Sequence, residues 1–310
     1  MTTLLATHPS FLEHDTGPHH PERPDRLRAI LAALEDPAFA GLARAEAPLA
    51  TLEQMARVHP AEYIETILGV QPEPGELVHI DGDTVMSTGS AEAVQRAAGA
   101  AVLCVDAVMQ GKVQTAFAAV RPPGHHATPT IPGGFCLINN AAVAARHAQA
   151  RHGLERVAIL DFDVHHGQGT QAVAEIDPSL FYASTHQYPL YPGTGSAREH
   201  GINGNVVNVP LPGGAGGLQF RAAWEQRILP ALDGFAPQLL VLSAGFDAHI
   251  DDPLAGLEVE TADFMWLTEA FREIAARHAG GRIVSVLEGG YDLGALADAV
   301  SSHLQVLMRD

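Results

Sequence analysis

One seven-residue stretch, residues 161–167, most constrains what this chain can fold into. It directly follows a short apolar run, 157–160, in which two of the four residues are β-branched, and it ends in a glycine. An apolar run of this kind predicts a buried strand of a parallel sheet. Because side chains two residues apart share one face of a strand, we expect Asp161, Asp163 and His165 to project together.

Carboxylates and an imidazole at one point indicate a site for a divalent metal ion. A network of hydrogen bonds between the same Asp and His side chains is the alternative, and it needs no metal. The stretch by itself allows both interpretations, so the rest of the chain has to decide between them.

Length and composition restrict the class of protein. The 310 residues, 46% of them apolar, suffice for one large α/β domain with a substantial core. No apolar run approaches the roughly 18 residues of a membrane span, and residues 1–10 lack the pattern of a secretion signal. Cys104 and Cys136 lie in apolar surroundings and form neither a disulfide framework nor a zinc knuckle. We therefore expect a cytoplasmic protein that does not bind membranes.

The net charge of -18, with only 18 Lys and Arg residues, argues against a nucleic-acid partner. An acidic field attracts cationic substrates. An excess of acid also simply keeps a protein soluble, and the charge alone does not separate these two effects.

The amino-terminal part combines a histidine-rich loop with a helix over 25–34. Four histidines in this loop are more typical of a solvated segment than of a metal site: His8, His14, His19 and His20. Arg26 lies in the first turn of the expected helix, where a cation opposes the helix dipole. We therefore expect Arg26 to be held there for an anion.

Strands and helices alternate along the rest of the chain. Strands are expected at 113–120, 157–160, 180–186 and 204–210, and at the start of the segments 239–249 and 283–291; helices are expected over 51–68, 89–109, 169–176 and 218–233, and from about 137 and 294 onward. The loop 187–204 is too long for a simple connection and is typical of a binding loop.

This alternation predicts one α/β domain over residues 1–310, with an open, mostly parallel sheet flanked by helices. In such sheets the ligand site lies beyond the carboxyl ends of the strands. His125, His126, Asp247 and Tyr291 follow expected strands just as the 161–167 stretch does. The sequence therefore predicts one cleft that all of these residues line.

Four motifs together resemble the zinc-dependent histone deacetylase family, and most closely its class II and bacterial amidohydrolase members. They are Arg-Pro-Pro-Gly-His-His-Ala at 121–127, Asp-Phe-Asp-Val-His-His-Gly at 161–167, Ser-Ala-Gly-Phe-Asp-Ala-His at 243–249 and Glu-Gly-Gly-Tyr at 288–291. Each motif alone is weak evidence, but the four occur in the order of the family, and the resemblance runs from about residue 8 to 300. It implies the arginase/deacetylase fold.

The resemblance implies a catalytic Zn²⁺ ion held by Asp163, His165 and Asp247. Three protein ligands leave one position open for water, as a catalytic zinc requires. The same ligand set accepts Fe²⁺. A structural K⁺ ion is implied as well, and its ligands would be Asp161, Ser184 and Thr185 together with backbone carbonyls.

The resemblance also implies the roles of the catalytic groups. His126 would act as general base and then protonate the leaving amine, while His125, paired with Asp161, would hold charge nearby. Tyr291 would donate a hydrogen bond to the developing oxyanion. Where many members have Asp or Asn, this chain has Gln168, and a neutral amide holds His126 without raising its pKa as a carboxylate would. The pH optimum therefore stays open.

Three residues match the family's acyl-lysine tunnel. Phe135 and Tyr191 would form its aromatic walls, with Tyr191 in place of the usual phenylalanine. The carbonyl of Gly134 would accept the amide N–H of the substrate.

Three further residues match positions around the tunnel. Arg26 would line the channel through which acetate leaves, and Asp81 would grip the substrate backbone at the rim, with Asp83 as a competitor for that role. Leu254 occupies the place where polyamine deacetylases of the family carry a gatekeeping glutamate.

The favoured interpretation is a zinc amidohydrolase that removes acetyl or other short acyl groups from lysine side chains in peptides or from similar small amides. An acetylpolyamine or other small-amide deacetylase is the alternative. The two-manganese arginase branch of the fold would need more carboxylates than the motifs supply. An inactive acyl-lysine reader is disfavoured by the complete set of His125, His126 and Tyr291. The physiological substrate, the acyl chain and the oligomeric state are left open by the sequence.

Overall fold

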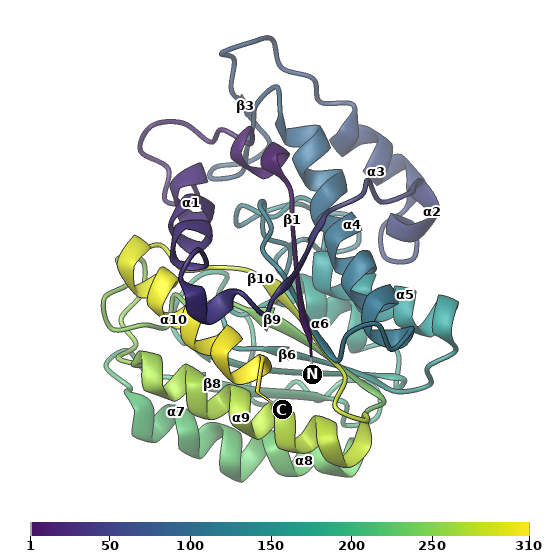
Figure 1. Ribbon diagram of the computed structural model, residues 1–310, viewed down its shortest axis with the longest axis vertical. Helices are drawn as coiled ribbons and strands as arrows, with labels where there is room; N and C mark the ends of the chain where they lie inside the picture. The colour runs from purple at the N-terminus through teal and green to yellow at the C-terminus, as the bar shows by residue number, and fades with distance from the viewer. Residues whose placement is uncertain (1, 310) are drawn as a thin grey trace.

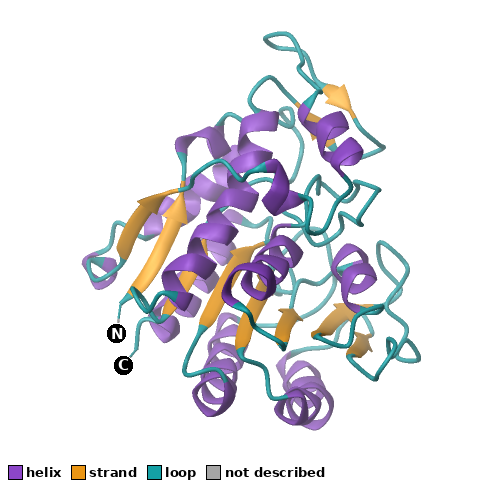
Figure 2. Ribbon diagram, turned by 90° about the vertical axis from the view of Figure 1, so that its right-hand side faces the viewer, coloured by secondary structure: helices purple, strands orange, loops and turns teal. Residues whose placement is uncertain are grey.

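The computed structural model describes residues 2–309, which form an α/β fold around one eight-stranded sheet (Figures 1 and 2). All neighbouring strands in this sheet run parallel, in the order β2-β1-β5-β10-β9-β6-β7-β8. The strands are β1 (Thr3–Thr7), β2 (Ala43–Glu46), β5 (Thr115–Ala118), β6 (Val157–Asp161), β7 (Leu180–Gln187), β8 (Val206–Leu211), β9 (Leu239–Ala244) and β10 (Ile283–Leu287). The predicted parallel sheet is confirmed.

The central strands are buried along their whole length because helices cover both faces of the sheet. Every residue of β5, β6, β9 and β10 is buried, which explains their nearly continuous apolar sequences. The main helices are α1 (Pro24–Ala33), α2 (Leu52–Met55), α3 (Ala61–Leu68), α4 (Ser90–Met109), α5 (Asn140–His152), α6 (Gln168–Ala174), α7 (Gly217–Ala223), α8 (Leu229–Phe235), α9 (Thr261–His278) and α10 (Leu293–Leu307).

Two expected elements differ from the structure. The single helix over 51–68 was wrong: α2 ends at Met55, and α3 begins only after Pro60, which lacks the N–H of a helical residue and disfavours helix at His59. The helix expected over 218–233 consists of α7 and α8, joined by one π-helical turn, η3 (Trp224–Ile228).

The expected strand alternation beyond residue 160 was also wrong. β6 ends at Asp161, so Asp163 and His165 lie in the irregular segment that follows it. The turn of the backbone, and not the pleat of a strand, therefore brings these side chains together.

A two-stranded antiparallel hairpin, β3 (Val78–His79) and β4 (Val85–Met86), stands apart from the sheet and carries Asp81 and Asp83 between its strands. Nowhere in residues 2–309 is a helix both long enough and apolar enough to cross a membrane.

Candidate active site

The predicted site residues meet where four neighbouring strands end. β5, β10, β9 and β6 are adjacent in the sheet, and the residues that follow them carry His125 and His126, Tyr291, Asp247, and Asp163 with His165. Since parallel strands end at the same edge, segments far apart in the sequence meet there. The structure thus brings together the residues that the four motifs contain.

Asp163, His165 and Asp247 form a group that could hold a metal ion. One potential ligand atom of each lies within 4.8 Å of the others. The Nδ1 atom of His165 is 3.1 Å from an oxygen of Asp163 and 3.1 Å from an oxygen of Asp247. All three side chains are buried, and three ligands of this kind leave coordination positions open.

The charges in this group favour a bound cation. Burial and the neighbouring charge of Asp163 raise the pKa of Asp247 to about 7. Burial acts against ionisation of Asp163 too, but His125 and His165 hold its pKa below the usual range. Two carboxylates packed side by side repel each other unless a positive charge lies between them. The residues present therefore fit a divalent metal ion.

Gly289 lies next to the predicted metal ligands, and because it has no side chain it leaves room for the carboxylates of Asp163 and Asp247. A Cβ atom at Gly289 would lie 2.5 Å from an oxygen of Asp163 and would also collide with Asp247. The N–H of Gly289 donates to that same oxygen of Asp163, at 2.8 Å. The glycine pair of the Glu-Gly-Gly-Tyr motif thus lets the backbone approach the predicted metal ligands.

His125 is bound to a buried carboxylate. Its Nδ1 lies 3.0 Å from Asp161, and Tyr182 donates to the same carboxylate oxygen at 3.1 Å. Burial would lower the pKa of His125, but the charges of Asp163 and Asp161 outweigh it and raise this pKa well above its usual value. Of the two histidines, His125 is therefore the one whose carboxylate neighbour favours the protonated form.

His126 lies beside His125, with 4.0 Å between the ring centroids. Its Nδ1 is 2.6 Å from the side-chain oxygen of Gln168, which can only accept a hydrogen bond, so Nδ1 carries the proton and Nε2 is free to accept one. Burial, followed by the charges of His125 and His165, lowers the pKa of His126 well below its usual value.

Tyr291 is held from three sides. Its backbone N–H donates to Asp252 at 2.7 Å, its ring packs edge-on against Phe135 with 5.9 Å between centroids, and the guanidinium of Arg26 lies 4.9 Å from its ring centroid. Burial and the charge of Asp247 raise the pKa of Tyr291 well above 10, so the phenol keeps its proton.

The expected anion for Arg26 is Glu22, and both side chains are fully buried. Arg26 donates to Glu22 at 3.0 Å and to the backbone carbonyls of Glu288 and Gly290. Arg121 donates to the same carboxylate. Arg26 therefore supports the segment that carries Tyr291.

Of the two predicted tunnel walls, Tyr191 lies near the site histidines and Phe135 lies near Tyr291. The ring of Tyr191 lies 5.0 Å from His126 and 6.4 Å from His165, and Phe135 contacts His20 at 4.7 Å, all between centroids. His20 also bonds the carbonyl of Asp83, so this histidine is not simply solvated. Gly134 has a φ of 55°, and a Cβ there would collide with both His126 and Tyr191.

The rim residues lie in two loops. Asp81 accepts hydrogen bonds from the N–H groups of Asp83 and Thr84, and one of its oxygens would lie 3.2 Å from a Cβ on Gly133. This places Asp81 close to the tunnel wall, and Asp83 remains a competitor. Leu254 is half-buried, and its N–H donates to Asp252.

The predicted potassium ligands do not all face one point. Ser184 of β7 is paired in register with Asp161 of β6. The hydroxyl of Thr185 lies on the other face of β7, where it accepts a hydrogen bond from Trp224 at 3.2 Å. Thr185 could therefore join Asp161 at one ion only through its backbone carbonyl, and its role as a potassium ligand stays a prediction.

Glu288 belongs to the Glu-Gly-Gly-Tyr motif, but the sequence predicted no role for it. One carboxylate oxygen accepts the N–H groups of Gly124 and His125, at 2.7 and 3.1 Å, and the other accepts the hydroxyl of Ser243. Its place directly after β10, equivalent to that of the other acidic site residues after their strands, was a signal that could have identified it.

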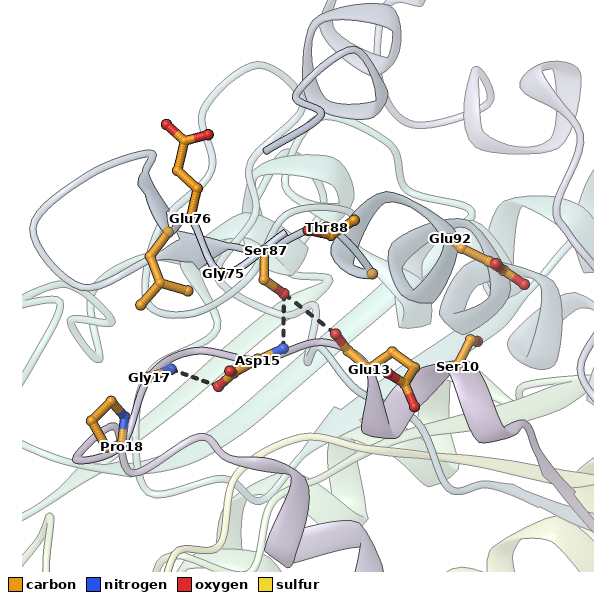
Figure 3. A pocket seen from close by; sticks show the side chains of 12 residues that line it. Ser10, Glu13, Asp15, Gly17, Pro18, Gly75, Glu76, Ser87, Thr88 and Glu92 are labelled. Carbon is orange, nitrogen blue, oxygen red and sulfur yellow. Dashed lines mark hydrogen bonds between the residues drawn. The ribbon is translucent and has the colours of Figure 1, made fainter. Parts of the chain in front are cut away.

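A separate surface hollow, drawn in Figure 3, lies between the segment after β1 and the start of α4. It has a volume of about 500 Å³. Its lining contains four acidic residues and no Lys or Arg: Glu13, Asp15, Glu76 and Glu92. None of the predicted site residues lines it, so it is separate from the candidate active site.

Comparisons with known proteins agree with this geometry. A sequence model of the histone deacetylase domain matches residues 20–307. The chain is 40% identical over 308 residues to "Histone deacetylase 14, chloroplastic" of Arabidopsis thaliana, covering 93% of this chain and 73% of that protein. It is 41% identical over 277 residues to "Histone deacetylase-like amidohydrolase" of Pseudomonas aeruginosa, covering 88% of this chain and 72% of that protein.

A third relative is "Polyamine deacetylase HDAC10" of Homo sapiens, 38% identical over 304 residues, covering 93% of this chain and 45% of that protein. Among solved structures, the HD domain of HDA15 superposes with a TM-score of 0.93 at 36% identity, covering 99% of this chain and 88% of that one.

Proposed function

The chain belongs to the histone deacetylase family, and from that premise we propose that it is a zinc-dependent amidohydrolase that removes acetyl or another short acyl group from the side-chain amine of lysine. The observation that carries this proposal is the buried group of Asp163, His165 and Asp247 next to the His125–His126 pair. It supplies a cation site with open positions and a proton acceptor at the same strand ends.

The metal site would be occupied by Zn²⁺, or by Fe²⁺, for which the ligand set is also suitable. The bound ion would supply Lewis acidity toward the scissile amide and toward a water molecule. The protein contributes the proton transfers. The free Nε2 of His126 takes a proton from the attacking water and then delivers it to the leaving amine, while protonated His125 offsets the negative charge that develops nearby.

Tyr291 would stabilise the oxyanion. Its high pKa keeps the hydroxyl protonated, so it can donate a hydrogen bond to the oxygen that becomes negative. The contacts of Asp252, Phe135 and Arg26 fix the phenol in advance, which reduces the reorganisation needed during the reaction.

The walls of the cleft suit a slender substrate arm. The rings of Phe135 and Tyr191 would contact the alkyl stem of an acyl-lysine, and the Gly134 carbonyl would accept its amide N–H. Asp81 would bind the substrate backbone at the rim. A K⁺ ion bound by Asp161 and Ser184, with the carbonyl of Thr185, would stabilise the loop that carries the metal ligands.

An acetylpolyamine deacetylase is the second candidate. It is favoured by the net charge of -18, by the acidic pair Asp81 and Asp83 near the tunnel wall, and by the polyamine deacetylase among the relatives. Leu254, at the position expected for a gatekeeping glutamate, argues against it. Turnover of matched acetyl-lysine peptides and acetylspermidine by one preparation decides between the two substrates.

The activity itself is tested with zinc-loaded protein and a fluorogenic acetyl-lysine amide. Tyr291→Phe should lower kcat by about 10²–10³-fold, because one oxyanion donor is lost. Zinc content and KM should change little, because the hydroxyl of Tyr291 is neither a predicted metal ligand nor part of the predicted tunnel wall. Tyr188→Phe, at an exposed tyrosine, is the matched control and should keep the parent rate. Full turnover by Tyr291→Phe would contradict the proposed mechanism.

A further inference from the structure

A second group of potential metal ligands lies outside the active site, between α4 and α5, which run beside each other (Figure 1). It consists of Asp106 in α4, His147 in α5 and His152, the last residue of α5. Within residues 2–309, this group and the one in the active site are the two in which three ligand atoms of separate residues lie within 4.8 Å of one another.

Both histidines of the group contact one carboxylate oxygen of Asp106. Nε2 of His147 lies 2.9 Å and Nε2 of His152 lies 2.7 Å from the same carboxylate oxygen of Asp106. His147 is buried, His152 is 15% exposed, and Asp106 is one-third exposed. Water can therefore reach the group from the Asp106 side while the protein encloses the other side.

This group is remote from the active site. α5 begins at Asn140, whose side chain bonds the carbonyl of Pro122 in the loop that carries the catalytic histidines. The helix is 13 residues long and ends at His152, and at about 1.5 Å per residue this separates the two ends by roughly 20 Å. The group thus lies toward the opposite edge of the sheet, and it cannot contact the same substrate.

We propose that Asp106, His147 and His152 form a second binding site for a transition-metal ion of the Zn²⁺ class. Two imidazole nitrogens and one carboxylate oxygen are a ligand set that such ions accept, with water in the remaining positions. The C-terminus of α5 carries the partial negative charge of the helix dipole at the same place, which also favours a cation. A bound ion would link α4 to α5.

The positions of the protons indicate how the site is controlled. Nη1 of Arg57 lies 2.5 Å from Nδ1 of His147. A guanidinium can only donate, so Nδ1 accepts and the proton of His147 lies on Nε2, where it donates to Asp106. Metal binding needs a free Nε2, which moves the proton to Nδ1 and forces Arg57 away.

Arg57 has a second partner besides His147. Its Nη2 lies 3.0 Å from Glu53, an exposed residue of α2, so the guanidinium can stay paired after it leaves His147. Arg57 therefore competes with the metal ion for His147, and it keeps its ion pair with Glu53 when the metal ion is bound. This competition makes the site weaker than the active-site centre, whose histidine has no such neighbour, and lets the metal ion exchange.

The test starts from protein whose active site is already loaded with zinc, titrated with further Zn²⁺ in a calorimeter, with metal analysis after gel filtration. The parent should take up a second equivalent, and Asp106→Asn and His152→Gln should each weaken that step by at least about 10-fold. His278→Gln is the matched control, because His278 donates to Asp233 at 2.8 Å with no second imidazole. The control should keep the second equivalent.

Arg57→Ala supplies a readout that a simple hydrogen-bond network would not give. This variant should bind the second zinc ion several-fold more tightly than the parent, and saturating Zn²⁺ should raise its thermal midpoint further. If the parent and Arg57→Ala both bind no zinc beyond the ion already in the active site, the proposal is overturned. So would a second equivalent that survives unchanged in both Asp106→Asn and His152→Gln.

Discussion

At the scale of single residues, the pair of His126 and Gln168 shows how one side chain sets the proton of another. The amide oxygen of Gln168 fixes the proton on Nδ1, and burial keeps the imidazole neutral. A carboxylate in this place would instead stabilise the imidazolium. The hydrogen bond from Gln168 raises the pKa of His126, but burial and the charges of His125 and His165 outweigh it.

Replacing this amide should therefore disable the base without disturbing the metal ligands. For Gln168→Ala we expect kcat to fall by about 10–100-fold, because the Nδ1-protonated tautomer and the ring orientation are no longer enforced. Zinc content should be unchanged, as measured by metal analysis on the same sample. Gln110→Ala, at an exposed amide after α4, is the control. A kcat for Gln168→Ala equal to that of the control would show that His126 needs no such partner.

The sequence indicated that the residues of the four motifs meet at one edge of the sheet, because each follows a strand whose apolar run is recognisable, and the structure brings them together there. The sequence does not give the direction of a side chain where tertiary structure sets it. Thr185 is next to Ser184 in the chain but faces Trp224 across the sheet. The group of Asp106, His147 and His152 has no motif, since its two histidines are five residues apart and its carboxylate comes from another helix.

At the scale of secondary-structure elements, Glu288 connects two neighbouring strand ends. It follows β10 and accepts the backbone N–H groups of Gly124 and His125, which follow β5. Burial raises its pKa to about 7, although His125 and these N–H groups favour the ionised form. One side chain therefore fixes the histidine loop relative to the segment of Tyr291.

Substitutions at Glu288 should separate this hydrogen-bonding role from a role of its charge. Glu288→Ala leaves two buried N–H groups without an acceptor, which should lower the free energy of unfolding by on the order of 2–5 kcal/mol. Glu288→Gln keeps an oxygen toward both donors and should lose less than about 1.5 kcal/mol. Urea unfolding measures both, with Glu65→Ala on the exposed side of α3 as the control. Equal losses for Ala and Gln would mean that the carboxylate charge, and not the hydrogen bonds, is what matters.

The elements themselves were predictable to different degrees. The long runs that became α4, β6, β9 and β10 have clear periodicity or continuous apolar character. The short strands at one side of the sheet do not. The edge strand β2 is four residues long and alternates half-buried with exposed positions, and its neighbour β1 is only five residues long and pairs with both β2 and β5. The break between α2 and α3 was signalled by Pro60, and this signal should have outweighed the helical periodicity.

At the scale of the whole molecule, the sheet and its helices bury several histidines in neutral form. His303 of α10 is fully buried between Thr268 of α9 and Ser285 of β10, with hydrogen bonds of 2.7 and 3.0 Å. Burial lowers its pKa to about 3. His14 and His59 are also buried, and burial lowers the pKa of each to about 4. All three lie outside the predicted metal centre, so their protonation reports on the fold.

These histidines should make the protein less stable in mild acid. In the unfolded chain a histidine takes up a proton below a pH of about 6.5, while folded His303 stays neutral down to about 3. The unfolded state therefore binds more protons between these values. The stabilising contribution is complete above about pH 6.5, and it is lost by up to about 1.4 kcal/mol per pH unit as the pH falls through this window.

His303→Gln tests this linkage directly, because an amide can bond Thr268 and Ser285 but does not titrate. We expect the variant to be less stable than the parent at pH 7.5, since the ring leaves a cavity. Between pH 7.5 and 4.5 the difference should shift by roughly 2.7 kcal/mol in favour of the variant, as measured by urea unfolding at each pH. Gln110→Ala, at an exposed amide that does not titrate, is the control and should follow the parent curve. A stability difference between His303→Gln and the parent that is the same at every pH would show that the pKa of His303 is the same in the folded and the unfolded chain, so that burial between α9, α10 and β10 does not keep the ring neutral.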